Sequence, residues 1–199
     1  MEERSLYRIA GHILCVEGTP EVEALKTLPG FPVFLTDEGE AEWTVRFGCA
    51  VEEPEGSTVL STFDFEEGII HSRFERKEGV YYYVMEPADP TVPTMVVCYA
   101  GGNSVEATRA SNPTMLRFGI WMALSMMSIA SGMLLIHSST IVHQNRAVLF
   151  LGESGTGKST HTRIWLKNIP DSHLLNDDSP VMAVENGVPV VYGSPWSGK

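Results

Sequence analysis

Alternating apolar and polar positions indicate a strand-rich first half of the chain. Up to about residue 104, short runs of β-branched and aromatic residues are separated by turn residues, a pattern typical of β-strands. Tight hairpins are predicted at "EEG", Glu66–Gly68, and at "KEG", Lys77–Gly79. We therefore predict a β-rich N-terminal module over residues 1–104, with a hinge at "YAGGNS", Tyr99–Ser104. The predicted strands lie in LYRIAGHILCV, EWTVRFG, TVLSTFDF, IIHSRFE, VYYYVME and TMVVCYA.

A longer apolar run, "FGIWMALSMMSIASGMLLI" at Phe118–Ile136, then begins. Its 19 residues contain no charge and are long enough to cross a bilayer. The run also contains three serines and an "SG" pair typical of a helix end. We interpret it as a buried helix that begins at Pro113, is capped by Ser111 or Asn112, and ends near Gly132, followed by a buried strand. No membrane partner is predicted.

The remaining sequence alternates strand-like runs with one more helix. "GMLLIH", "TIVHQ" and "AVLFL" lead into a glycine-rich loop, and "KSTHTRIWLKNI" after it predicts a helix ending at Pro170. "HLLND", "PVMAVE" and "PVVYG" predict further strands, with a hairpin at Asn186–Gly187. The predicted class is therefore α+β or α/β, with residues 105–199 forming a helix plus a P-loop nucleotide-binding, kinase-like domain.

Charge and cysteine content restrict the function classes. The net charge is −11, and residues 1–110 hold 20 acidic and 8 basic side chains, against 5 and 6 in residues 111–199. An acidic first half argues against a nucleic-acid partner, because phosphate backbones require clustered Lys and Arg. The three cysteines have no zinc or disulfide spacing, and the N-terminus lacks the pattern of a signal peptide. These features favour a reducing cytoplasm.

The glycine-rich loop matches the Walker A pattern G-x-x-x-x-G-K-[ST]. Its glycines allow the backbone to point several N–H groups at phosphate oxygens, and Lys158 would neutralise the β- and γ-phosphates. The Ser159 hydroxyl can bind Mg²⁺, and the following helix presents its positive end to the same anion. We expect ATP as the nucleotide, with GTP left open. The predicted nucleotide-binding residues are Gly152, Glu153, Ser154, Gly155, Thr156, Gly157, Lys158, Ser159 and Thr160.

Two carboxylates and a histidine are candidates for the chemistry near this loop. Asp177 and Asp178 end an apolar run soon after the loop, where a strand would bring them beside the phosphates. They favour metal and base roles, although Asp-Ser-Pro is also good turn chemistry. Because successive strand side chains alternate, only one of the pair should face the acceptor. His137 ends an apolar strand 15 residues before Gly152, a position that is more often structural than catalytic.

A second string with glycine–lysine spacing, "GSPWSGK" at Gly193–Lys199, does not complete the pattern. It lacks the Ser or Thr after the lysine, and proline and tryptophan are poor phosphate-cradle residues. We interpret the match as accidental, with a loop at the rim of the nucleotide or acceptor site as the alternative.

The stretch from Ile136 to Ser159, followed by "NDD", resembles the catalytic domain of HPr kinase/phosphorylase, a bacterial serine kinase related in fold to phosphoenolpyruvate carboxykinase. The resemblance covers roughly residues 132–183. It implies a kinase domain of that type, in which His137 and Lys158 are active-site residues, Ser159 is a metal ligand and Asp178 is the catalytic base. Asp177 is then assigned to the metal.

Several departures from the family bear on function. Thr160 replaces a glutamate, the run to the acids is two residues longer, and the later metal carboxylate and catalytic arginine have no counterpart before Lys199. Two explanations are left open: either the kinase domain is a shortened one, or the chain is a fragment and the domain is incomplete at its C-terminus. We predict an ATP-dependent kinase that phosphorylates a protein serine or a small-molecule hydroxyl, with the oligomeric state left open. The alternatives are a nucleotide-binding regulatory or assembly module without turnover and a carboxykinase-like enzyme.

Overall fold

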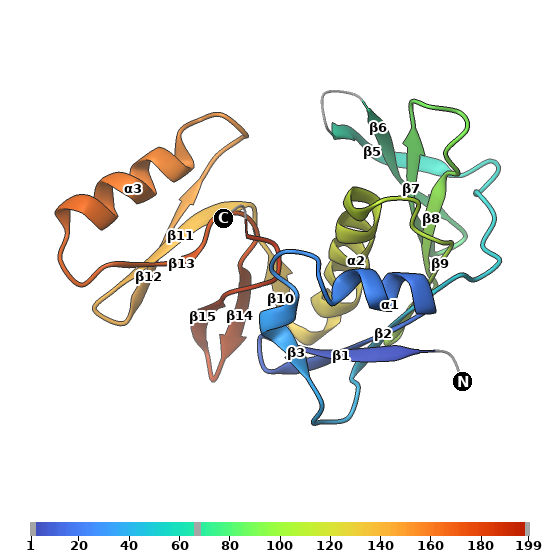
Figure 1. Cartoon of the computed structure of the whole chain (residues 1–199). Helices are drawn as coiled ribbons and strands as arrows, with labels where there is room; N and C mark the ends of the chain where they lie inside the picture. Colours follow the sequence, from blue (N-terminus) through green and yellow to red (C-terminus); the bar gives the residue numbers. More distant parts are fainter. Residues whose placement is uncertain (1–2, 66–68, 198–199) are drawn as a thin grey trace.

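The structure, a computed structural model, describes residues 3–65 and 69–197. Its largest element is a mixed sheet of nine described strands in the order β3-β1-β2-β4-β9-β8-β7-β6-β5 (Figure 1). β4 pairs in parallel with β2 and β9, and the other neighbours pair antiparallel. The strands are β1 (Arg4–Ile9), β2 (His12–Glu17), β3 (Leu35–Thr36), β4 (Trp43–Phe47), β5 (Thr58–Phe65), β6 (Ile70–Lys77), β7 (Val80–Pro87), β8 (Met95–Tyr99) and β9 (Ser104–Ala107).

The turns of this sheet account for much of the predicted pattern. β6 and β7 form the hairpin predicted at Lys77–Gly79, where Glu78 and Gly79 have positive φ angles of 50° and 86°. The turn predicted at Glu66–Gly68 lies outside the described residues. The run LYRIAGHILCV is two strands, because Ala10 and Gly11 adopt positive φ and turn the chain back. A short helix, α1 (Thr19–Leu25), was not predicted.

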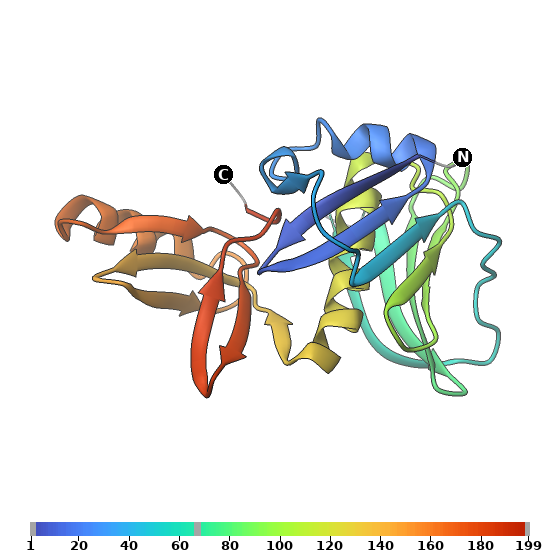
Figure 2. The same ribbon diagram turned by 90° about the horizontal axis from the view of Figure 1, so that it is seen from below.

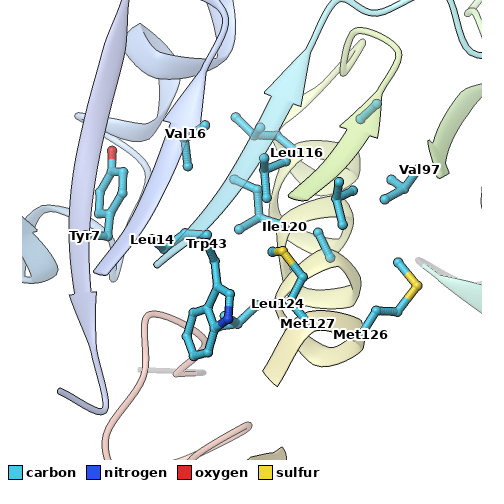
Figure 3. Close-up of a cluster of buried hydrophobic side chains, with 14 of the residues drawn as sticks. Tyr7, Leu14, Val16, Trp43, Val97, Leu116, Ile120, Leu124, Met126 and Met127 are labelled. Atoms are coloured by element: carbon cyan, nitrogen blue, oxygen red, sulfur yellow. The ribbon is translucent and has the colours of Figure 1, made fainter. Parts of the chain in front are cut away.

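One apolar helix, α2 (Pro113–Ser128), covers a face of the large sheet (Figures 2 and 3). The Asn112 side chain caps it by accepting a hydrogen bond from the Met115 amide at 2.9 Å, and Gly132 follows in a left-handed conformation. The predicted cap, start and end of the helix are therefore confirmed. Full burial of side chains such as Ile120 and Leu124 stabilises the fold by about 1.5–3 kcal/mol each.

The helix is also the candidate for a membrane span. Residues Pro113–Ser131 are long and apolar enough to cross a bilayer, but 56% of the apolar window is buried inside the fold. Its buried side chains contact the large sheet and, through Met133 and Val181, the C-terminal region. The apolar run is thus the core helix that the sequence predicted, which is consistent with a soluble protein.

The rest of the chain forms two small sheets and one helix. One sheet has the order β10-β14-β15, and the other β12-β11-β13, which carries α3 on one side. All their strand pairs are antiparallel, including the hairpin at Asn186–Gly187. The elements are β10 (Met133–Leu135), β11 (Ser138–His143), β12 (Arg146–Leu151), α3 (Lys158–Asn168), β13 (His173–Asn176), β14 (Val181–Glu185) and β15 (Val188–Tyr192).

The predicted fold class, α+β or α/β with a P-loop kinase domain, is wrong. Strand makes up 42% and helix 21% of the structure, so the protein is β-rich around a large mixed sheet. The strand that enters the glycine-rich loop, β12, lies at the edge of an antiparallel three-stranded sheet rather than in a parallel α/β sheet. One strand–loop–helix unit is typical of α/β proteins, but it does not determine the pairing of the many short strands around it. The division expected after residue 104 falls at the start of β9, inside the large sheet, and α2 packs against that sheet.

Candidate functional site

The glycine-rich loop lies between β12 and α3, as the sequence predicted. Gly152, Gly155 and Gly157 have φ angles of 152°, 79° and 94°, so each uses backbone conformations that other residues rarely adopt. Gly157 is the N-cap of α3, which begins at Lys158. The residues from Gly152 to Thr156 and Thr160 are exposed, whereas Gly157, Lys158 and Ser159 are half-buried. The loop therefore presents its backbone and the start of a helix to solvent, an arrangement suited to an anion.

Lys158 folds back over the loop. Its Nζ donates hydrogen bonds to the carbonyl oxygens of Gly152 at 2.8 Å and Glu153 at 2.9 Å. The Thr156 hydroxyl also donates to the Glu153 carbonyl, at 2.8 Å. An ammonium group has three donors and no acceptor, so phosphate oxygens placed in the loop are natural partners for it.

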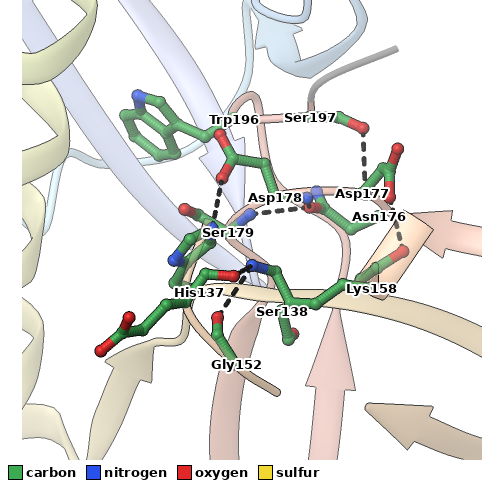
Figure 4. Close-up of polar contacts among 12 residues, drawn as sticks. His137, Ser138, Gly152, Lys158, Asn176, Asp177, Asp178, Ser179, Trp196 and Ser197 are labelled. Atoms are coloured by element: carbon green, nitrogen blue, oxygen red, sulfur yellow. Dashed lines mark hydrogen bonds and ion pairs between the residues drawn. The ribbon is translucent and has the colours of Figure 1, made fainter. Parts of the chain in front are cut away.

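His137 and Asp178 are brought together by the backbone. Asp178 follows β13, and its carbonyl accepts a hydrogen bond from the Ser138 amide at 2.8 Å, while the Ile136 amide donates to Pro180 at 3.1 Å. These bonds hold the segment before β11 against the segment after β13 (Figure 4). As a result, His137 Nε2 lies 3.8 Å from Asp178 Oδ1, an ion pair when the imidazole is protonated.

Asp177 makes different contacts from Asp178. Its Oδ1 accepts a hydrogen bond of 2.5 Å from the Ser139 hydroxyl, which lies 2.5 Å from the Thr162 hydroxyl. Ser139 and Thr162 are buried, so this chain of polar groups ties Asp177 to β11 and to the helix that begins at the loop. Sequence reasoning did not identify Ser139 or Thr162, since a serine on a strand and a threonine in a helix are unremarkable taken singly.

The electrostatic setting of Asp178 differs from that of an exposed carboxylate. Burial raises the pKa of Asp178 above its ordinary value, and the nearby positive charges of His137, Arg117 and Lys158 offset part of that rise. Burial likewise lowers the pKa of Arg117, although the attraction of Asp178 opposes this. A carboxylate with a raised pKa beside a positive group in a cavity is suited to accept a proton.

A buried asparagine shapes the turn that carries both acids. Asn176 Oδ1 accepts hydrogen bonds from the amides of Asp178 and Ser179, each at 3.0 Å. Its Nδ2 donates to the carbonyl and the hydroxyl of Ser194 at 3.1 and 3.2 Å. Sequence reasoning missed this residue, although an asparagine before Asp-Asp fits a side chain that bonds the backbone two residues ahead.

The "GSPWSGK" string packs against the same turn. Trp196 is 1% exposed, and its indole N–H donates to the Arg117 carbonyl at 2.9 Å, while its ring meets Phe31 edge-on at 5.5 Å. The Trp196 carbonyl accepts a hydrogen bond from the Ser179 amide at 3.0 Å. This segment, described up to Ser197, is therefore a support of the acid-bearing turn, and Trp196 also borders the cavity beside it.

A cavity of about 540 Å³ joins the loop to the acid. Ser154 from the glycine-rich loop, His137, Asp178 and Ser179 form its polar side. The other side is aromatic and belongs to β5 and α2. A molecule in this cavity would contact both the loop and Asp178.

The residues predicted to bind Mg²⁺, Ser159 and Asp177, carry oxygen atoms, the type of ligand that this ion prefers. No group of three or more His, Cys, Asp or Glu side chains gathers as a metal site within residues 3–65 and 69–197. Mg²⁺, however, is commonly held by one or two protein oxygens together with nucleotide phosphates and waters. Ser159, in the first turn of α3, and Asp177, tied to that helix through Ser139 and Thr162, supply oxygen ligands of this kind.

No protein-family model matches the chain, and no curated protein matches it.

Proposed function

We propose that the protein is an ATP-dependent phosphotransferase that moves the γ-phosphoryl group of ATP to a hydroxyl group, as the resemblance to HPr kinase implies. One observation carries the proposal: Ser154 of the glycine-rich loop and Asp178 line the same cavity, so a phosphate donor and a proton acceptor can meet there. Phosphoryl transfer needs mainly positioning and charge stabilisation.

Each group has a role in the proposed reaction. The backbone of the loop and Lys158 would bind the β- and γ-phosphates, with the start of α3 adding its partial positive charge. Asp178 would accept the proton of the acceptor hydroxyl as its oxygen attacks the γ-phosphorus. His137, 3.8 Å from Asp178, would orient that carboxylate. Mg²⁺ bound through Ser159 and Asp177 would neutralise charge on the phosphates.

We place this reaction in the cytoplasm, in line with three cysteines whose spacing shows no zinc or disulfide pattern. A carboxykinase-like activity fits less well, because its carboxylate substrate would meet the carboxylate of Asp178 in the cavity.

Nucleotide binding at the loop is tested by Lys158→Ala in calorimetric titrations with Mg²⁺·ATP and Mg²⁺·GTP. Loss of charged hydrogen bonds to phosphate should weaken affinity about 10- to 100-fold. Lys167→Ala, at the exposed far end of α3, is the matched control and should leave affinity unchanged. Equal affinity in Lys158→Ala and the parent would exclude the loop as the site. ATP binding without transfer to any acceptor would favour the regulatory alternative.

A further inference from the structure

The cavity beside Asp178 has a wall that phosphate chemistry alone does not explain. Six apolar or aromatic side chains form it: Phe63 and Phe65 from β5, Phe118, Trp121 and Met122 from α2, and Trp196. Apart from Trp196, which follows β15, these side chains belong to the large sheet and its core helix and not to the small sheet that carries the loop. The N-terminal part of the chain thus builds one side of the cavity.

This wall is held in place by ring contacts. Phe65 stacks on Phe118 with ring centroids 3.9 Å apart, which joins the edge strand of the sheet to α2. Phe63 stacks on Tyr83 at 5.7 Å, and Trp196 is fixed by its hydrogen bond to Arg117. A preformed apolar wall of this kind favours ligands that place an apolar body against it.

The polar features of the cavity limit the charge of such a ligand. The charged side chains among its described lining residues are Asp64 and Asp178, together with His137. The Asp64 carboxylate lies on the other face of β5 from Phe63 and Phe65 and pairs with His71 at 2.8 Å. An anionic ligand would therefore meet the carboxylate of Asp178, so a neutral ligand is favoured over an anion.

We infer that the acceptor is a small, uncharged alcohol with an aromatic or aliphatic body, bound with its hydroxyl at Asp178 and its body against the aromatic wall. This inference rests on the proposed phosphotransferase function. The volume of about 540 Å³ lies within the range of small-molecule sites, roughly 300–1,000 Å³. A serine side chain would itself place only a CH₂OH group beside Asp178, and the wall would have to be covered by apolar neighbours in its peptide.

The reaction is balanced with ATP as the phosphoryl donor. The alcohol oxygen forms a bond to the γ-phosphorus, the bond from that phosphorus to the β,γ-bridging oxygen breaks, and ADP leaves. The hydroxyl proton passes to Asp178 and then to solvent. The products are the phosphate monoester, ADP and one proton.

Binding is tested first, without nucleotide. 2-Phenylethanol is titrated into the full chain while the indole N–H signals of Trp121 and Trp196 are followed by NMR. We expect saturable shifts that are lost in Met122→Trp, which fills the cavity. A second variant, Phe63→Ser on β5, removes part of the same apolar wall and should weaken binding at least about 10-fold. Ile129→Trp, which adds an indole at a position 61% exposed outside the cavity, should bind like the parent.

Transfer is measured next, with [γ-³²P]ATP and four acceptors: 2-phenylethanol, ethanol, 3-phenyllactate and a serine-containing peptide. We expect kcat/KM for 2-phenylethanol to exceed that for ethanol by about 100-fold, from burial of the ring. 3-Phenyllactate, which adds a carboxylate, should be at least about 10-fold poorer than 2-phenylethanol.

The outcomes separate this inference from the proposed function. Absence of saturable 2-phenylethanol binding, or equal binding in the parent, Met122→Trp and Phe63→Ser, overturns the inference. Preferred transfer to the peptide also overturns it while the phosphotransferase function stands. If the parent binds no ATP, the proposed function fails, and the NMR titration still decides whether the cavity binds a neutral aromatic alcohol.

Discussion

Replacement of the buried Asn176 by alanine tests how the acid-bearing turn is built. The side chain is 1% exposed and makes four hydrogen bonds, two to the amides of Asp178 and Ser179 and two to Ser194. Each is worth about 0.5–1.5 kcal/mol, and amides left buried without partners add to the cost. We therefore expect Asn176→Ala to lower the free energy of unfolding by about 3 kcal/mol. For a domain of this size, that loss lowers Tm by about 6–12 °C.

Urea denaturation of parent and variant measures this loss, provided the m-values agree. Asn168→Ala is the matched control, because Asn168 is exposed and makes one side-chain hydrogen bond, to the Ile164 carbonyl. It should change stability by less than about 0.5 kcal/mol. Asn176→Ala should also lower phosphotransfer more than ATP affinity, since it frees the turn that carries Asp178 and leaves the loop intact. A loss of stability below about 1 kcal/mol would refute this account of the turn.

Two further predictions concern the surroundings of the acid. Trp196→Ala should lower the free energy of unfolding by about 3–5 kcal/mol, because a fully buried ring and its contact with Phe31 are lost. Urea denaturation measures this loss, with Val33→Ala, at a position 83% exposed, as the control. A loss as small as that of Val33→Ala would contradict the prediction. Activity should fall as the pH drops through the raised pKa of Asp178, because the base must be ionised. Arg117→Met removes one of the positive charges that lower this pKa, so the acid limb of the plot of kcat against pH should move to higher pH. Arg163→Met is the control and should leave that limb in place. If the limb does not move in Arg117→Met, the ionisation of Asp178 does not determine the acid limb.

Local sequence signals predicted the local structure well. Asn112, one of the two predicted caps, the helix end near Gly132, the strand–loop–helix unit at the glycine-rich loop and the hairpin at Asn186–Gly187 were all confirmed. In each case a few neighbouring residues determine the conformation, through a side-chain cap or a glycine with positive φ.

Contacts between segments that are distant in the sequence could not be predicted. The antiparallel pairing of β12 at a sheet edge depends on which strands lie beside it, and short apolar runs do not specify their partners. Asn176 and Trp196 could not be placed at the site for a related reason. Their partners, Ser194 and Arg117, are 18 and 79 residues away.

The aromatic side of the cavity is a second example. It combines Phe63 and Phe65 of β5 with α2, about 55 residues further along the chain, and with Trp196 near the C-terminal end of the described residues. Phe63 and Phe65 are two residues apart on β5 and so share a face of that strand, but this spacing does not indicate that the face meets α2.

The central claim is that Asp178 accepts the proton of an acceptor hydroxyl during transfer from ATP bound at the loop. Asp178→Asn keeps the size of the side chain and removes the basic oxygen. Because burial raises the pKa of Asp178, the ionised carboxylate costs stability in the folded state above that pKa, so the variant should be at least as stable as the parent at pH 7.

The decisive measurement compares Asp178→Asn with the parent in two assays. Phosphotransfer is measured with [γ-³²P]ATP and either 2-phenylethanol or a serine peptide, and ATP affinity is measured by calorimetry. We predict that ATP affinity stays within about 3-fold while the transfer rate falls about 10²- to 10⁴-fold, the range expected for loss of a general base. Full turnover by Asp178→Asn would contradict the account.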